Sequence, residues 1–153
     1  MAKIERPIFF DADSLIELWG CGGKFYKKLC NVLQENMCVS EVVKGEFKGA
    51  KDHATGQWRP SPAHKITPTS VPRLVTIGDL SDEQYTQYQT FFSELKSVGP
   101  GERETFALAW VLEYDVCSHD TEAWDIFRKQ KPTDSLSRHR TLLPLLRYLK
   151  IIQ

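Results

Sequence analysis

Two aspartates stand directly after a short apolar run near the start of the chain, in the stretch 8–15, IFFDADSL. Asp11 follows Phe10 at once, and Asp13 comes two residues later. Such an apolar run suits a strand that is buried on both faces of a parallel sheet. In open α/β sheets, chemistry gathers at the carboxyl ends of the strands. The pair therefore indicates a metal site, without specifying the reaction.

Other acidic residues also stand at the ends of expected elements. They are Glu46, Glu102, Glu104 and Asp120. Because the ends of parallel strands meet at one edge of a sheet, we expect these acids to gather around one cleft. Converging carboxylates repel each other unless a cation neutralises them. Mg²⁺ or Mn²⁺, which prefer oxygen ligands, are the expected occupants.

The elements that must position these acids alternate between strand-like and helix-like segments. Strands are expected at 8–10, 37–39, 74–77 and 116–117, and helices from near Ser14 and at 25–33, 41–47, 81–97, 102–114, 121–129 and 142–149. Ser40 and Ser81 are predicted N-caps, and Gln84 completes a capping box with Ser81. This alternation predicts an α/β fold of three layers, with a central, mostly parallel sheet between helices.

The whole chain is typical of one ordinary globular domain. Its 153 residues suit a single domain, taken as 1–153, and the formal net charge is 0, so bulk charge does not indicate a nucleic-acid partner. No apolar run reaches the roughly 18 residues of a membrane span. The N-terminus has no signal-peptide pattern, and the four cysteines lack metal-site or disulfide spacing. We therefore expect a cytoplasmic protein without membrane contact.

The acid-bearing stretches, taken together, resemble the PIN-domain ribonucleases. They read FFDADSL, SEVVKGEF, GPGERETFALAW and VCSHDTEAW, and the resemblance covers nearly the whole chain. PIN domains carry an Asp after the first strand, a Glu on an early helix, an acid opening a later Ala- and Leu-rich helix, and an Asp in a T/S-x-D context. This chain departs from the commonest pattern by having Glu on the later helix and Ser118 before Asp120.

The resemblance implies a role for each residue of the first and last stretches. Asp11 would be a direct metal ligand, Glu46 the early-helix acid, and Asp120 a ligand or an acid that supports one. Asp13 would orient Asp11 or hold a metal-bound water molecule. Ser118 would hydrogen-bond a first-strand carboxylate.

On the later helix two acids compete for one role. We favour Glu104, which immediately precedes the Ala/Leu run, and keep Glu102 in the site. Helix capping or helix opening is the alternative explanation for Asp13, Glu102 and Asp120.

The implied activity is metal-assisted hydrolysis of RNA phosphodiester bonds by an endoribonuclease, with a bound Mg²⁺ or Mn²⁺ activating water. Residues 48–72 form a long polar loop with four prolines, and such loops are usually functional or disordered. Its basic and aromatic side chains are candidates for stacking and phosphate contacts with single-stranded RNA. These are Lys48, Lys51, Trp58, Arg59 and Lys65.

The resemblance also implies protein partners. Small PIN proteins are often toxins, which implies a cognate antitoxin, and a homodimer is a further expectation from the family.

Two other functions remain open. FDADS also resembles the D-x-D of haloacid-dehalogenase-type phosphatases, with Asp11 as nucleophile and Asp13 as general acid/base, and LVTIGDLSDE imitates a later element of that superfamily. Residue 14 is Ser where those enzymes usually have Gly, and this alternative leaves Glu104 and Asp120 unexplained. The third function is a non-catalytic PIN-like scaffold that binds RNA or a protein.

Overall fold

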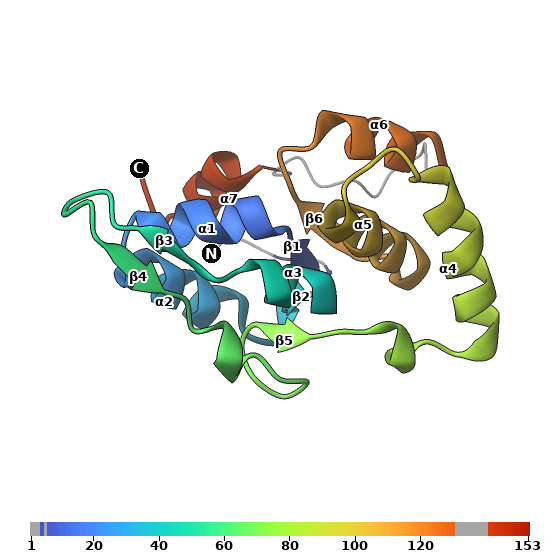
Figure 1. Cartoon of the computed structure of the whole chain (residues 1–153), viewed down its shortest axis with the longest axis horizontal. Coiled ribbons are helices and arrows are strands. Elements are labelled where there is room, and N and C mark those ends of the chain that lie inside the picture. The colour runs from blue at the N-terminus through green and yellow to red at the C-terminus, as the bar shows by residue number, and fades with distance from the viewer. Residues whose placement is uncertain (1–3, 5, 131–140) are drawn as a thin grey trace.

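A parallel sheet forms the centre of the computed structural model, which describes residue 4, residues 6–130 and residues 141–153 (Figure 1). The sheet has four strands in the order β5-β2-β1-β6. They are β1 (Ile8–Phe10), β2 (Met37–Val39), β5 (Arg73–Leu74) and β6 (Asp115–Cys117). All neighbouring strands pair in parallel. The predicted α/β class with a central parallel sheet is confirmed.

Helices cover both faces of this sheet. In chain order they are α1 (Ala12–Gly20), α2 (Gly23–Leu33), α3 (Glu41–Glu46), α4 (Asp82–Glu94), α5 (Pro100–Leu112), α6 (Thr121–Gln130) and α7 (Leu142–Tyr148). Ile8 and Phe10 belong to one buried apolar cluster with residues of α1, α2 and α7, whereas Phe9 belongs to another with residues of α4, α5 and α6. Alternate residues of β1 thus face opposite cores, as a strand's period of two requires. Figure 1 shows the two sets of helices on opposite sides of the sheet.

The predicted caps are present, but several predicted boundaries were wrong; α5, for example, begins at Pro100 rather than 102, and α4 ends at Glu94 rather than 97. Ser40 and Ser81 accept backbone N–H groups of the helices that they precede, and Ser81 and Gln84 form a capping box. The first helix begins at Ala12 rather than near Ser14, because Asp11 is its N-cap. The third expected strand, 74–77, is shorter: β5 ends at Leu74, and the 3-10 helix η3 (Ile77–Asp79) follows.

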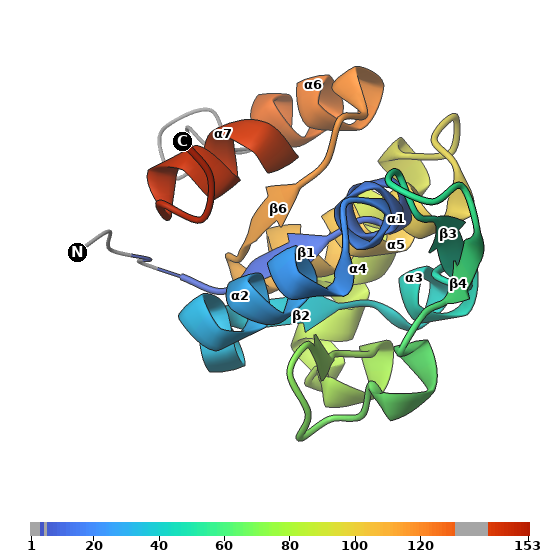
Figure 2. The same ribbon diagram turned by 90° about the vertical axis from the view of Figure 1, so that its left-hand side faces the viewer.

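The stretch 48–72, expected as a long loop, contains an antiparallel hairpin. Its strands are β3 (Gly49–Lys51) and β4 (Trp58–Pro60), followed by the 3-10 helix η2 (Ala63–Lys65). The hairpin turn is held by Asp52, which accepts the N–H groups of Ala54 and Thr55. Figures 1 and 2 both show the hairpin beside α1. Short strands with polar residues carry little periodicity, which is why the sequence pattern did not predict them.

The remaining 3-10 helix, η1 (Gln34–Asn36), joins α2 to β2. Among the described residues, no helix combines the length and the apolar character that crossing a membrane requires.

Candidate functional site

The register of the sheet brings the ends of β1 and β6 together. Phe10 pairs with Cys117, so the residues that follow, Asp11 and Ser118, lie side by side. The Ser118 hydroxyl donates to Asp11 Oδ2 at 2.6 Å. The hydrogen bond predicted from Ser118 to a first-strand carboxylate is therefore present.

Asp11 is a buried carboxylate with two fixed hydrogen bonds. Asp11 is only 1% exposed, and its Oδ1 accepts the N–H of Ser14 at 2.9 Å. Burial raises the pKa of Asp11, the hydrogen bonds from Ser118 and Ser14 oppose that rise, and the charge of Asp13 adds to it. None of these neighbours is a cation that would stabilise the ionised carboxylate. A bound metal ion would supply that stabilisation.

Two glutamates from other elements act electrostatically on these aspartates. Burial raises the pKa of Glu102, and the charges of Asp11, Asp120 and Asp13 raise it further. Burial also raises the pKa of Glu46, with the charges of Asp13 and Asp11 as the next causes. We call these five residues the acidic cluster. They come from the end of β1, the first turn of α1, α3, α5 and the residue before α6.

Gly101 explains how Glu46 of α3 reaches α5. A Cβ at this position would overlap Glu46 Oε1, so only glycine leaves room for the carboxylate. Gly101 is buried, and it immediately precedes Glu102 on the same helix. The missing side chain at Gly101, in the first turn of α5, thus leaves Glu46 and Glu102 at the same end of this helix.

Glu104 lies elsewhere. Its Oε1 accepts the N–H of Glu41 at 3.1 Å, at the start of α3. Burial raises the pKa of Glu104, the N–H groups of Val42 and Glu41 oppose that rise, and its charged neighbour is Glu41 rather than Asp11. Residues two apart on a helix point about 200° away from each other, so Glu102 and Glu104 cannot share one site. Our preference for Glu104 is therefore reversed in favour of Glu102.

Asp120 and Asp13 differ in their structural roles. Asp120 Oδ1 accepts the N–H of Ala123 at 2.8 Å, so Asp120 caps α6, and its charge also raises the pKa of Glu102. Asp13 does not cap α1, because Asp11 already accepts the N–H of Ser14. Asp13 is exposed in the first turn of α1 and is free to face solvent or a ligand.

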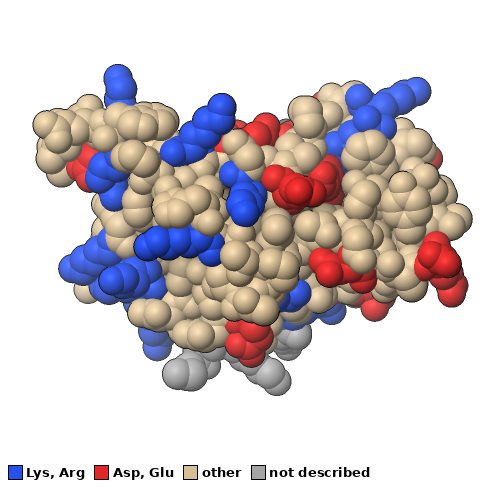
Figure 3. All heavy atoms as spheres, turned by 60° about the horizontal axis from the view of Figure 1, so that its bottom comes forward, with Lys and Arg blue, Asp and Glu red and all other residues tan. Residues whose placement is uncertain are grey.

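A groove of about 600 Å³ adjoins the acidic cluster. Asp13 and Glu46 line it together with Glu17 of α1, while Lys48, Lys51, His53 and Trp58 line it from the hairpin. Trp58 is 58% exposed, so its ring is accessible to a ligand. Figure 3 shows more Lys and Arg side chains on the left of one face and more acidic groups toward its centre and right, with a few of each kind elsewhere.

Two of the five candidate RNA-binding residues lie apart from this groove. The Arg59 guanidinium lies 4.4 Å from the centre of the Trp19 ring and pairs with Asp52 at 3.1 Å. These contacts give Arg59 a structural role in the hairpin. Lys65 lines a different cavity, between α1 and α2.

Sequence reasoning missed Glu17 and His119, which also lie near the site. Glu17 lines the groove, and its Oε2 is 3.7 Å from Nε2 of His119, which stands between Ser118 and Asp120. The spacing of Asp13 and Glu17, four residues apart, places both on one face of a helix and was the available signal.

The donor set fits a hard divalent cation by its chemistry. Within the described part of the chain, no three Asp, Glu, His or Cys side chains lie close enough together to hold a metal ion as they stand. The acidic cluster nevertheless offers only carboxylate oxygens, the ligands that Mg²⁺ and Mn²⁺ prefer. Glu46 and Glu102 have rotatable side chains that can turn toward Asp11, whose own position is fixed by Ser14 and Ser118.

Neither family models nor curated proteins match this sequence. The PIN-domain resemblance therefore stands on the residues described above and stays a prediction.

Proposed function

We propose that this protein is a Mg²⁺- or Mn²⁺-dependent endoribonuclease whose metal is held by Asp11, Glu46, Glu102 and Asp120. One observation carries the proposal: carboxylates from separate elements act on one another at the carboxyl edge of a parallel sheet. Like charges so placed are costly unless a cation binds among them. A single acid with a structural role would not require other carboxylates around it.

The residues of the site have distinct tasks in this proposal. Asp11 is the fixed ligand, because hydrogen bonds from Ser14 and Ser118 hold both of its oxygens. Glu46 and Glu102 complete the ligand set from α3 and α5. Together with Asp11 and Asp120 they would hold a divalent cation, which would supply water activation and charge neutralisation for phosphodiester hydrolysis. No protein nucleophile is needed.

The hairpin supports RNA as the substrate. Lys48 and Lys51 line the groove beside Asp13 and Glu46, where they can contact backbone phosphates. The exposed ring of Trp58 offers a stacking surface for an unpaired base. Stacking combined with phosphate contact is how single strands are commonly bound.

The experiment that tests the proposal is cleavage of a fluorescently labelled single-stranded RNA by purified protein with Mn²⁺. We expect cleavage that EDTA stops and that Asp11→Asn abolishes, because an amide is a poor ligand for the cation. Asp125→Asn is the matched control, since Asp125 is an exposed acid on α6 outside the acidic cluster. The control should cleave like the unmodified protein.

The same preparation separates the alternatives. Hydrolysis of p-nitrophenyl phosphate without RNA cleavage would contradict the nuclease and support the phosphatase. RNA binding with neither cleavage nor Mn²⁺ binding would support the non-catalytic scaffold. Asp79 is the first aspartate of LVTIGDLSDE, the stretch that imitates a later phosphatase element. It does not favour the phosphatase, because its Oδ2 accepts the N–H of Thr76 in the capping box of η3.

A further inference from the structure

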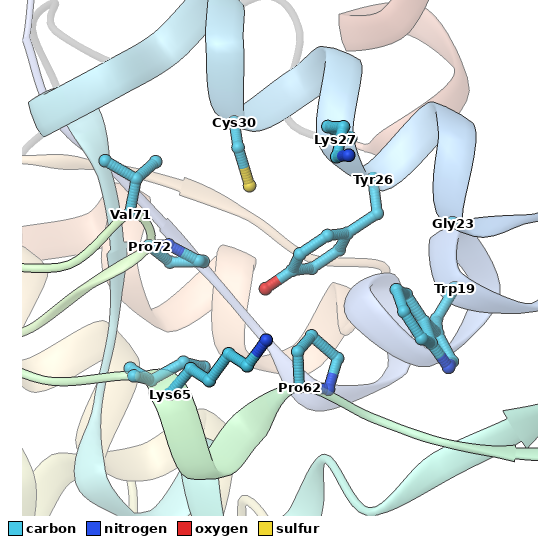
Figure 4. A pocket seen from close by; sticks show the side chains of 10 residues that line it. Trp19, Gly23, Tyr26, Lys27, Cys30, Pro62, Lys65, Val71 and Pro72 are labelled. Carbon is cyan, nitrogen blue, oxygen red and sulfur yellow. The ribbon is translucent and has the colours of Figure 1, made fainter.

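A second cavity, of about 450 Å³, lies between α1, α2 and the segment 62–72 (Figure 4). Its walls are largely apolar and include Trp19, Tyr26, Cys30, Ile66 and Pro72. It shares no lining residue with the groove beside the acidic cluster. The cavity is therefore a separate feature, and the nuclease proposal does not use it.

The walls of this cavity are held in place by hydrogen bonds and by contacts between aromatic rings. The Trp19 indole N–H donates to the backbone oxygen of Arg59 at 3.2 Å, and the Trp19 ring packs edge-on against Tyr26 with centroids 5.3 Å apart. On the opposite wall, the backbone oxygen of Ile66 accepts from Lys44 Nζ at 2.7 Å. These contacts form a site before any ligand arrives, which lowers the entropic cost of binding.

The charged side chains that line the cavity are both basic. They are Lys27 and Lys65, and no acidic side chain lines the cavity within the part of the chain that the structure describes. Both lysines are exposed, and over the described ranges neither takes part in an ion pair. Figure 4 shows the Lys65 ammonium and the Tyr26 hydroxyl pointing toward one another across the cavity. An anionic group between them would meet a cation and a hydrogen-bond donor.

We infer that this cavity binds a small amphipathic anion, a flat apolar body that carries one carboxylate, sulfonate or phosphate. Small-molecule sites are typically about 300–1,000 Å³, mostly apolar, with a few polar groups that fix orientation. Trp19 and Tyr26 supply the apolar walls, and Lys27 and Lys65 supply the charge complementarity. The anion rather than a neutral molecule is favoured because neither lysine has an acidic partner among the described residues.

The test is a fluorescence titration with 8-anilinonaphthalene-1-sulfonate, an aromatic anion, in EDTA and without RNA. We expect saturable binding of one molecule per chain. The neutral dye N-phenyl-1-naphthylamine should bind about tenfold more weakly, because it cannot use the lysines. Omitting metal and RNA makes failure here independent of failure of the nuclease proposal.

Charge-reversal variants locate the site. Lys27→Glu with Lys65→Glu should weaken dye binding by about tenfold or more. The control, Lys24→Glu with Lys28→Glu, changes net charge equally at exposed lysines of α2 that do not line the cavity and should bind like the unmodified protein. Equal weakening by both pairs, or equal affinity for the neutral dye, would overturn the inference.

A plug variant tests the cavity without changing charge. Gly23 lines the cavity, and a Cβ added there would make ordinary contacts at 3.6 Å with the Trp19 ring and with Arg59 Nη1, so Gly23→Leu should fold and reduce the space in the cavity. Circular dichroism would check its folding, and dye binding should fall by about tenfold. Unchanged binding by this folded variant would contradict the site. Once reduced binding by this variant has located the site, competition with the dye by AMP or by 1-naphthoate would distinguish a phosphate from a carboxylate ligand.

Discussion

At the scale of single residues, Asp11 combines two roles in one carboxylate. Its Oδ1 caps α1 through Ser14, and its Oδ2 accepts from Ser118. A carboxylate has about four acceptor positions, so both oxygens keep capacity for a cation. The burial that raises the pKa of Asp11 also excludes water that would otherwise weaken the attraction between the carboxylate and a metal.

The two glutamates of α5 give a matched test of the site. Glu102→Gln should lower Mn²⁺ affinity and RNA cleavage by about 10- to 100-fold, because it removes a charge beside Asp11. Glu104→Gln should leave both nearly unchanged, since the amide oxygen can still accept the N–H of Glu41. Isothermal titration with Mn²⁺ measures the affinities. The opposite ranking would restore Glu104 to the site.

These residues also show what the sequence could and could not predict about the site. The PIN-domain resemblance implied a hydrogen bond from Ser118 to a first-strand carboxylate, and the structure shows it on Asp11, because both residues follow strands whose ends meet at one edge of a parallel sheet. The choice between Glu102 and Glu104 depends on how α5 is rotated about its axis, and both residues precede an apolar run that fits either rotation. The place of Arg59 depends on its stacking on Trp19, 40 residues away in sequence, which no local pattern specifies.

At the scale of elements, α3 and α5 meet where Gly101 has no side chain. Gly101→Ala should push the Glu46 carboxylate aside, because a Cβ there overlaps Oε1 at the end of a flexible side chain. Stability should stay equal or rise by up to about 1 kcal/mol, since alanine favours helix over glycine. Mn²⁺ affinity should fall at least about tenfold.

Gly45→Ala in α3 is the control for that substitution, because a Cβ there meets nothing within 4 Å. It makes the same chemical change in a helix beside the site. Thermal unfolding and Mn²⁺ titration should show higher stability with unchanged affinity. If both alanine variants bind Mn²⁺ normally, Glu46 is not a ligand.

The β3–β4 hairpin is the element that we expect to contact RNA. Trp58→Ala should weaken binding of single-stranded RNA by about fivefold or more, because base stacking contributes about 1–3 kcal/mol. Lys51→Ala should weaken binding less and reduce its dependence on salt concentration. Fluorescence anisotropy with Asp11→Asn as the background prevents cleavage during the measurement. Lys24→Ala, at an exposed lysine outside the groove, should change neither value.

At the scale of the whole molecule, the class and layering follow from patterns that extend over many residues. Alternating strand-like and helix-like segments predicted the parallel sheet, since short connections leave few other arrangements. The hairpin was missed because its strands are three residues each, which is too short for a period of two to be recognised in the sequence. The predicted helix 81–97 carries an apolar stripe of Tyr85, Tyr88, Phe92 and Leu95, which could form core or a subunit interface. Tyr88 and Leu95 are buried within the chain, Phe92 is half-buried, and Tyr85 is 39% exposed, so most of the stripe is internal. The homodimer therefore gains no support from that stripe and, like the antitoxin, stays a prediction that sedimentation and co-purification can test.

Metal-free stability should depend on pH through the acidic cluster. Burial raises the pKa of Asp11, Glu46 and Glu102, so the folded state binds protons more tightly than the unfolded chain. Stability from these groups is complete below their unfolded pKa, about 4, and is lost as pH rises through the folded values. In EDTA, the free energy of unfolding should therefore receive a smaller contribution from them at pH 7.5 than at pH 4.5.

Urea unfolding of the protein and of Asp11→Asn with Glu102→Gln measures this contribution. The pKa of Asp52 is lowered, chiefly by backbone hydrogen bonds from Ala54 and Thr55, but its opposite effect is common to both proteins and cancels. The double variant should therefore lose less stability than the unmodified protein when the pH is raised from 4.5 to 7.5. An identical pH dependence would show that these carboxylates are not coupled to folding.

The most direct test of the central claim is a crystal structure of the protein grown with Mn²⁺, with the ion located by its anomalous scattering. The account predicts one strong peak at about 2.0–2.3 Å from a carboxylate oxygen of Asp11, with Glu46, Glu102 or Asp120 completing its ligands. Mn²⁺ found away from Asp11, or no bound Mn²⁺ at millimolar concentration, would contradict the assignment of a metal centre to the acidic cluster.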